Sequence, residues 1–256
     1  MEVDKREWNV PGWVDLGTDV DKGRAFYSAL LGWETPEGSE ETAFYSNATL
    51  NGKSVAGIYQ QQEGMPSFWT TYVIVENVDD VAGKVKDAGG QIFMAPMDVM
   101  DYGRMAVLAD PIGAAFGVWQ PGTHKGAEIV NEPGAYTWSE LITTDVEGSK
   151  SFYQAVFGWS GDTQTSGPVE YTQWMIGDRP VGGMMQKPDM IPAEVPPHWG
   201  VYFAVANIDD GIAKVKELGG SVMMEDPIDT PAGKVVPVAD SHGANFNIIE
   251  LSGDVG

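Results

Sequence analysis

The sequence predicts an α+β fold built from four βαβββ modules, and three observations support this class. A helical stretch at residues 19–33 returns as an approximate copy at residues 145–159, which marks an internal duplication. Segments that alternate apolar and polar residues follow each copy, as half-buried strands do. Gly, Pro and Asn-Gly turns separate those segments and limit their lengths.

The first module begins with a short strand at residues 13–16 and continues as a helix. Asp19 is placed to cap this helix, because its side chain accepts hydrogen bonds from free backbone N–H groups. The helix ends at Gly32, a residue type that accepts the left-handed conformation. Two strands are expected within residues 43–59, on either side of Asn51-Gly52, which is a strong hairpin signal.

The second module repeats this order with a strand at residues 70–75 and a helix that Asn77 caps. The apolar stripe of this helix closes at Gly89-Gly90. Three strands follow, and an Asp-Pro-x-Gly type I turn separates the last two. These strands are predicted at residues 91–95, 104–109 and 114–120.

Landmark residues of the first half recur at nearly constant spacing in the second half. Tyr45 matches Tyr171 and Gly57 matches Gly183, both 126 residues later. A second set is offset by 130 residues: Trp69 with Trp199, Asp80 with Asp210, Gly103 with Gly233, Asp110 with Asp240 and Gly113 with Gly243. The four-residue difference lies in a loop before Trp199, where insertions are tolerated.

The repeat divides the chain into two predicted domains. We place the first at residues 8–122 and the second at residues 135–252. Residues 123–134 contain Gly and Pro and are interpreted as the linker between them.

Composition restricts the partners. The net charge is −22 with only 15 Lys and Arg residues, which disfavours nucleic acids and anionic membrane surfaces. The chain has no Cys, so disulfides and thiolate chemistry are excluded. No run of about 18 apolar residues predicts a membrane span. The first residues lack the apolar core of a signal peptide, so a cytoplasmic location is expected.

Taken together, these motifs resemble the vicinal oxygen chelate superfamily, which includes glyoxalases, bleomycin- and fosfomycin-resistance proteins and extradiol dioxygenases. The resemblance rests on the helix that ends in Phe-Tyr-x4-Gly-Trp and on the later pattern Gly-Arg/Lys-x5-Asp-x-x-Gly-Ala. It covers nearly the whole chain, twice, and is strongest to tandem two-domain glyoxalase-like proteins of actinobacteria. It implies that the modules pair into two glyoxalase-like domains, whose curved mixed sheets enclose cavities.

The resemblance also implies where a divalent metal would bind, normally through two His and one Glu on the sheet. Matched by motif, these positions are Trp13, Thr70 and Gly117 in the first half, and Trp138, Gly200 and Asn247 in the second. None is a His or a carboxylate, so we predict no metal and no cofactor. The histidines, His124, His198 and His242, are interpreted as solvated loop residues. An alternative metal set stays open, drawn from Asp15, Glu140, Gln120, Glu250 or His198.

Strand alternation assigns other side chains to the expected cavities, because residues two apart share one face of a sheet. The candidate catalytic residues are Asp15, Glu140, Tyr72 and Tyr202. The candidate ligand-binding residues are Trp13, Thr70, Trp119, Trp138, Asn245 and Asn247. Core packing is the alternative for the tryptophans, and an exposed strand position is the alternative for both carboxylates. A carboxylate buried beside Trp would have a raised pKa and would suit general acid–base catalysis.

The first functional hypothesis is a metal-free protein that binds or sequesters a small aromatic or polyketide-like metabolite, because flat aromatic linings suit flat ligands. The second is an enzyme without a metal that isomerises, cyclises or hydroxylates such a metabolite. The third is a metal-dependent lyase or dioxygenase. The expected partner is a small molecule, and the chain is expected to be a monomer or a homodimer.

Overall fold

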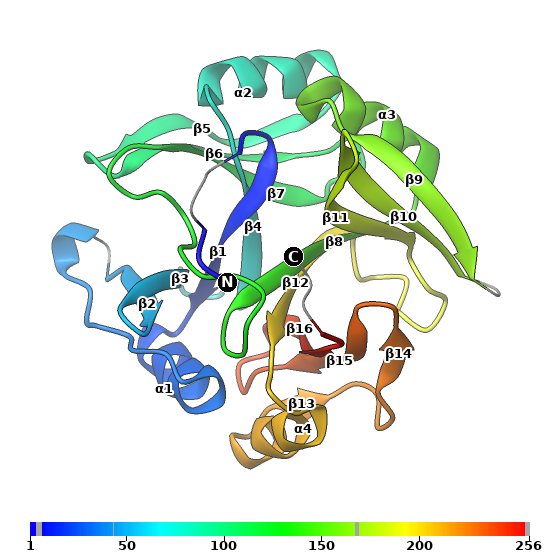
Figure 1. Ribbon diagram of the computed structural model, residues 1–256. Helices are drawn as coiled ribbons and strands as arrows, with labels where there is room; N and C mark the ends of the chain where they lie inside the picture. Colours follow the sequence, from blue (N-terminus) through cyan, green and yellow to red (C-terminus); the bar gives the residue numbers. More distant parts are fainter. Residues whose placement is uncertain (4–6, 43, 167–168, 254–256) are drawn as a thin grey trace.

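The computed structural model describes residues 1–3, 7–42, 44–166 and 169–253, which form two mixed β-sheets and four α-helices (Figure 1). Every strand of the seven-stranded sheet comes from the first half of the chain, and every strand of the nine-stranded sheet comes from the second. The α+β class is therefore confirmed. Within these described residues, no helix is both long and apolar enough to span a bilayer.

The first sheet has the strand order β2-β3-β1-β4-β7-β6-β5. Its elements are β1 (Val10–Thr18), α1 (Val20–Leu31), a 3-10 turn (Glu40–Thr42), β2 (Ser46–Leu50), β3 (Lys53–Gln60), β4 (Phe68–Ile74), α2 (Val78–Asp87), β5 (Gln91–Val99), β6 (Gly103–Ala109) and β7 (Ala115–Pro121). The pairs β1–β3 and β4–β7 are parallel, and the other neighbours are antiparallel.

The second sheet has the order β13-β15-β16-β12-β8-β11-β10-β9, and β14 pairs with β15 beside this path. Its elements are β8 (Tyr136–Thr143), α3 (Val146–Phe157), β9 (Ser160–Ser166), β10 (Val169–Ile176), β11 (Arg179–Gln186), β12 (His198–Ala204), α4 (Ile208–Glu217), β13 (Ser221–Val222), β14 (Ile228–Thr230), β15 (Gly233–Ala239) and β16 (Asn245–Leu251). The strands β8 and β12 are its centre, as β1 and β4 are in the first sheet.

The helix and turn signals of the sequence act as expected. The Asp19 side chain accepts a hydrogen bond from Lys22 N, and Gly32 ends α1 with φ of 74°. Asn77 caps α2 by accepting from two backbone N–H groups. Asn51 and Gly52 both have positive φ at the β2–β3 turn, as a two-residue hairpin of this type requires.

Among the described residues, the first module has two strands after its helix, β2 and β3, as expected within residues 43–59. Residues 34–42 form one isolated bridge, between Glu34 and Thr49, and then the 3-10 turn. Pro36 cannot donate a ladder hydrogen bond, and Gly38 weakens an extended segment, which disfavours a longer strand there. The second and third modules have the predicted order, whereas the fourth has four strands after α4.

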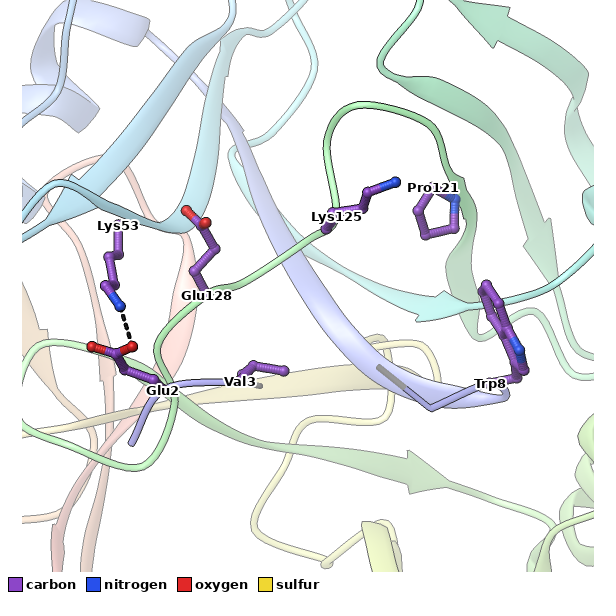
Figure 2. A pocket seen from close by; sticks show the side chains of 7 residues that line it. All are labelled: Glu2, Val3, Trp8, Lys53, Pro121, Lys125 and Glu128. Carbon is purple, nitrogen blue, oxygen red and sulfur yellow. Dashed lines mark ion pairs between the residues drawn. The ribbon is translucent and has the colours of Figure 1, made fainter. Parts of the chain in front are cut away.

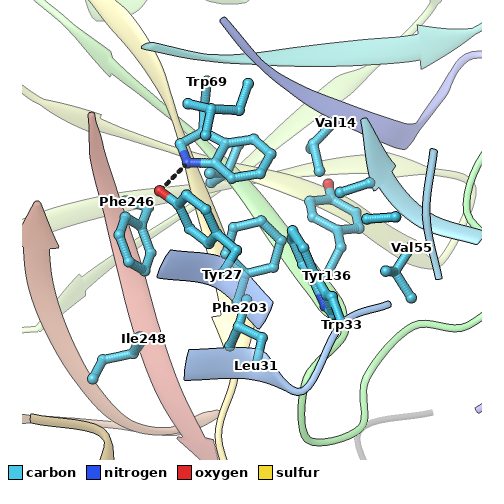
Figure 3. Packing of buried hydrophobic residues seen from close by; sticks show 14 of the residues in the cluster. Val14, Tyr27, Leu31, Trp33, Val55, Trp69, Tyr136, Phe203, Phe246 and Ile248 are labelled. Atoms are coloured by element: carbon cyan, nitrogen blue, oxygen red, sulfur yellow. Dashed lines mark hydrogen bonds between the residues drawn. The ribbon is translucent and has the colours of Figure 1, made fainter. Parts of the chain in front are cut away.

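The two halves share their hydrophobic cores. Tyr27 and Trp33, at the end of α1, pack on Phe203 and Phe246 of the second sheet (Figure 3). The Tyr27 and Phe246 ring centroids are 5.4 Å apart, and so are those of Trp33 and Phe203. In the mirror arrangement, Tyr153 of α3 lies 5.8 Å from Phe116 of the first sheet. Aromatic side chains of α1 and α3 thus contact the sheet of the other half.

A buried hydrogen-bond chain repeats at both shared cores. Trp69 Nε1 donates to Tyr27 Oη at 3.0 Å, and Tyr27 Oη donates to Asp240 Oδ2 at 3.1 Å. In the copy, Trp199 Nε1 donates to Tyr153 Oη, which donates to Asp110. The Tyr of each Phe-Tyr helix therefore binds the Asp turn of the opposite half.

We call the face of each sheet that packs on the other half its inner face, and the opposite one its outer face. Val14 and Leu16 of β1 lie on the inner face. Strand alternation therefore places Trp13 and Asp15 on the outer face of the first sheet. The same rule places Trp138 and Glu140 of β8 on the outer face of the second, because Leu141 belongs to the shared core.

Candidate functional site

The outer face of the first sheet holds a buried carboxyl group among aromatic side chains. Asp15 lies on β1 opposite Gly57 of β3 and Thr70 of β4, and only 5% of its surface is exposed. Gly57 has no side chain, and a Cβ there would overlap the Tyr45 hydroxyl. Trp13 Nε1 donates to that Tyr45 hydroxyl at 3.0 Å. The carboxyl group is therefore enclosed by the sheet at Gly57 and Thr70 and by the nearby aromatic rings.

Burial controls the charge of Asp15. It raises the pKa of this carboxyl group from 3.8 to about 7, and hydrogen bonds from Tyr72 and Thr70 limit the rise. Oδ1 of Asp15 has no hydrogen-bond partner among the described residues. Burial and the Asp15 charge raise the pKa values of Tyr45 and Tyr72 well above the usual range, so both remain neutral donors.

The outer face of the second sheet repeats this group. Glu140 on β8 lies opposite Gly183 of β11 and Gly200 of β12. Tyr202 Oη donates to Glu140 Oε1 at 2.9 Å. Trp138 Nε1 donates to Tyr171 Oη at 3.0 Å, and the space for that hydroxyl is again left by a glycine, Gly183. Both faces therefore carry one Trp–Tyr pair beside one carboxyl group.

Burial also raises the pKa of Glu140, and hydrogen bonds from Tyr202 and Tyr171 limit the rise. Burial and the charge of Glu140 in turn raise the pKa values of both tyrosines. The second site therefore presents a carboxyl group able to exchange a proton, together with two neutral phenol groups. Neither carboxyl group is exposed, so that alternative for Asp15 and Glu140 is wrong.

The structure brings most candidate residues together within their own halves. In the first sheet Trp13 pairs with Tyr72, and Thr70 lies beside Asp15. In the second sheet Tyr202 pairs with both Trp138 and Asn247. Asn247 Nδ2 donates to Val201 O at 3.4 Å. Asn245 begins β16 and its side chain is exposed.

The sequence prediction omitted Tyr45 and Tyr171 from the site, although both contact its tryptophans. The signal that could have found them is the common spacing of 126 residues. This spacing relates Tyr45 to Tyr171 and also relates Gly57 to Gly183. Each glycine makes room for the tyrosine hydroxyl of its own half. The glycine and the tyrosine therefore form one structural unit, which occurs once in each half.

The linker covers the outer face of the first sheet. The His124 ring lies 4.4 Å from the Trp13 ring, and Trp119 Nε1 donates to His124 O at 3.0 Å. Ala127 N donates to Gly12 O at 2.9 Å, and Ala127 is buried against Trp13 and Trp119. The interpretation of His124 as a solvated loop residue is therefore wrong. The His124 ring is held in place by contact with the rings of Trp13 and Trp119. The period of strands and helices in the sequence does not predict such a contact.

A surface pocket of about 480 Å³ is lined in part by residues of this linker (Figure 2). Lys53 forms an ion pair with Glu2 at one end of it, and Trp8 lies at the other end. The remaining lining residues are Val3, Pro121, Lys125 and Glu128. Neither Asp15 nor Glu140 lines it, so this pocket is separate from the two carboxyl sites.

The donor set does not fit the divalent metal of the superfamily resemblance. Within residues 1–3, 7–42, 44–166 and 169–253, no three His, Asp or Glu side chains lie close enough to hold a metal ion. Two members of the alternative set have structural roles elsewhere. Gln120 accepts from Val78 N and Glu250 accepts from Ile208 N, so both cap helices. They do not join Asp15 or Glu140.

Comparison with known proteins gives close relatives along almost the full length. The sequence model of the Glyoxalase/Bleomycin resistance protein/Dioxygenase superfamily matches residues 136–248. The anthracycline biosynthesis protein DnrV of Streptomyces peucetius is 39% identical over 259 residues, covering 94% of this chain and 93% of that protein. CFP32 of Mycobacterium tuberculosis (strain CDC 1551 / Oshkosh) is 41% identical over 252 residues, covering 94% of both.

Solved structures share the fold at low identity. The Mn(II)-bound glyoxalase from Novosphingobium aromaticivorans superposes with a TM-score of 0.66 at 17% identity, covering 96% of this chain and 83% of that one. The 2,2',3-trihydroxybiphenyl 1,2-dioxygenase of Sphingomonas wittichii strain RW1 gives 0.66 at 13% identity, covering 97% and 93%. At these identities the likeness concerns the fold alone.

Proposed function

The chain belongs to the Glyoxalase/Bleomycin resistance protein/Dioxygenase superfamily, and from this premise we propose that it binds a small aromatic, polyketide-like metabolite without a metal. The observation that carries the proposal is the repeated unit of a buried carboxyl group, a Trp–Tyr pair and a second Tyr. Aromatic rings offer flat apolar contact, and the carboxyl and phenol groups hydrogen-bond the polar edge of a flat ligand.

The names of two relatives support this ligand class. DnrV of Streptomyces peucetius and DauV of Streptomyces sp. (strain C5) are both named anthracycline biosynthesis proteins, and each is 39% identical to this chain. An anthracycline is a fused aromatic polyketide with hydroxyl and ketone groups at its edge. Such a molecule matches the mixture of aromatic and hydrogen-bonding side chains on the outer faces.

The residues at the expected metal positions support binding without a metal. Trp13 and Trp138 replace the first His, and Thr70 and Gly200 replace the second. An indole nitrogen carries a hydrogen and cannot ligate a cation, and here both indoles donate that hydrogen to tyrosine. At the position of the first metal ligand, each half thus has a tryptophan that hydrogen-bonds a tyrosine of the aromatic lining.

A titration with 1,8-dihydroxyanthraquinone tests this proposal. We expect saturable quenching of tryptophan fluorescence, since Trp138 lies beside the proposed contact surface. The double variant Asp15→Asn with Glu140→Gln should bind at least about 10-fold more weakly, because a hydrogen bond to a charged group contributes about 1.5–3 kcal/mol. The double variant Glu170→Gln with Asp226→Asn, at exposed positions, is the matched control. Quenching that does not saturate, or equal affinity in all variants, contradicts the proposal.

A second candidate function is proton-transfer catalysis, which the raised carboxyl pKa values favour. A general base works best when its pKa is near the working pH, and the pKa of Asp15 is about 7. The carboxylate of Glu140 would take a proton from a carbon beside a ketone, and the electron pair would move onto the ketone oxygen. As Glu140 takes the proton, the hydroxyl groups of Tyr202 and Tyr171 would turn from Glu140 and donate hydrogen bonds to that oxygen, and return of the proton to another carbon would complete an isomerisation.

Hydrogen–deuterium exchange into 2-tetralone tests this second candidate. The protein is expected to accelerate loss of the proton signal beside the ketone at least about 10-fold over buffer, as general base catalysis provides. Proton NMR in deuterated buffer measures the rate. The double variant Asp15→Asn with Glu140→Gln should return the rate to that of buffer while its circular dichroism spectrum still shows a folded protein. Exchange no faster than in buffer for the parent protein removes this candidate.

A further inference from the structure

The two outer faces differ in how much of the site is accessible. In the first half Trp13 is 3% exposed and Tyr72 is 5% exposed. In the second half the corresponding Trp138 and Tyr202 are half-buried. The apolar cluster on the first face contains Ala127 of the linker, whereas the described residues of the cluster on the second face all belong to the sheet. Both carboxyl groups are buried, but the aromatic residues beside Glu140 are more accessible than those beside Asp15.

Hydrogen bonds hold the linker over the first face. Ala127 N donates to Gly12 O at 2.9 Å, and the Glu128 carboxylate accepts from Ser54 N at 2.8 Å. The first residues pair with the linker, because Val3 N donates to Glu128 O and Val130 N donates to Met1 O, both at 2.9 Å. The first face is thus covered by a segment that is hydrogen-bonded on both of its sides.

The second face lacks one side chain beside its carboxyl group. Gly200 lies directly opposite Glu140, and Thr70 occupies the matching position of the first half. A Cβ added at Gly200 would meet Asn247 Nδ2 at 3.5 Å and Glu140 O at 3.7 Å, which are ordinary contact distances. No positive φ forces a glycine at this position. The second half therefore has room for one small group where the first half has a threonine side chain.

The charge of the second site selects among ligands. Glu140 is in none of the ion pairs of the described residues. The side chains that hydrogen-bond to it, Tyr202 and Tyr171, are neutral. A buried carboxylate without a cation is stabilised by a positive ligand and repels a negative one. Aromatic rings such as those of Trp138 and the two tyrosines also attract cations.

We propose that the outer face of the second half alone is the ligand site, and that it prefers a flat aromatic molecule with a protonated amine to one with a carboxylate. This inference rests on the proposed binding function and specifies its place and ligand charge. The amine lies against Glu140, Tyr202 and Tyr171, and the ring lies over Gly200 beside Trp138. The first half keeps the same residues as a closed structural copy.

Calorimetric titration of the full chain with 1-naphthylmethylamine and with 1-naphthoate tests the inference at pH 7. We expect one site per chain and at least 10-fold tighter binding of the amine. Glu140→Gln should reduce the preference to about 2-fold, because it removes the charge and keeps the shape. Gly200→Thr, which copies the first half, should weaken the amine at least 10-fold. Glu170→Gln is the control with the same chemistry at an exposed position.

The outcomes separate this inference from the proposed function. Three results would each overturn this inference, even if 1,8-dihydroxyanthraquinone binds. They are two sites per chain, equal affinity for both naphthalenes, and unchanged binding in Gly200→Thr with an unchanged circular dichroism melt. Absence of binding by the amine, the carboxylate and the anthraquinone overturns the proposed function itself. A lower melting temperature of Gly200→Thr is checked with Gly200→Ala, which adds one methyl group and should weaken the amine to an intermediate degree.

Discussion

Residues 1–134 and 135–256, produced as separate chains, are expected not to fold on their own. Separation would expose Phe26 and Tyr27 of α1, which pack on the sheet of the second half. It would expose Phe203 and Phe246 of that sheet in the other fragment. Each large apolar side chain that loses its cover forfeits about 2 kcal/mol. The whole stability of a domain is about 5–15 kcal/mol, so a few such losses remove it.

The hydrogen-bond chains add to this cost. Without the second half, Tyr27 Oη loses Asp240, and without the first half, Tyr153 Oη loses Asp110. A buried polar group without a partner costs about 1–3 kcal/mol. Both fragments therefore lose apolar burial and hydrogen bonds at the same surface.

Circular dichroism and urea titration measure this prediction. Each fragment alone should show no cooperative unfolding transition, and a refolded equimolar mixture should recover one. A full chain cleaved within the loop at residues 188–197 is the control, because this cut leaves both shared cores intact. A cooperative transition in either fragment alone would show that the halves are independent.

Asp15→Asn is expected to stabilise the protein at pH 8 relative to the parent, and to leave it nearly unchanged at pH 4. The folded-state pKa of about 7 lies above the ordinary value of 3.8, so the folded protein holds this proton more tightly than the unfolded chain. The resulting stability is fully present below about pH 4 and is lost as the pH rises through about 7. The loss is about 4 kcal/mol, which the neutral amide avoids.

Urea unfolding of the parent and the variant from pH 4 to pH 8 measures this difference. Subtraction of the two curves removes the contribution of the other carboxylates, which are common to both proteins. Asp226→Asn is the control for the loss of one carboxylate at an exposed position, and it should not reproduce the stabilisation expected for Asp15→Asn. Parallel curves for the parent and Asp15→Asn would mean that Asp15 is charged in the folded protein at pH 4 and above.

Much of the fold was predictable because its signals are local. The caps at Asp19 and Asn77, the left-handed end at Gly32 and the Asn51-Gly52 turn each depend on a few neighbouring residues. The segment before β2 depends less on such signals: it pairs through one bridge, between Glu34 and Thr49, and the nearby Pro36 cannot donate a ladder hydrogen bond.

The candidate site was predictable only in part. Alternation along β1 and β8 placed Trp13 with Asp15 and Trp138 with Glu140, since side chains two apart share a face. Tyr45 and Tyr171 come from other strands, and no local rule says that their hydroxyl groups end beside a tryptophan. The division into domains at residues 8–122 and 135–252, and the choice between monomer and homodimer, stay predictions.

The sequence by itself indicated a duplication, and it determined the α+β class and the carboxylate beside a tryptophan in each half, because these follow from spacing and from the period of strands and helices. Only the tertiary structure decided that Tyr27 and Tyr153 hold the halves together, and that His124 and Ala127 cover Trp13 while Trp138 stays half-buried. These contacts join residues far apart in the chain. Their formation depends on how two sheets pack, and no periodicity along the chain records that packing.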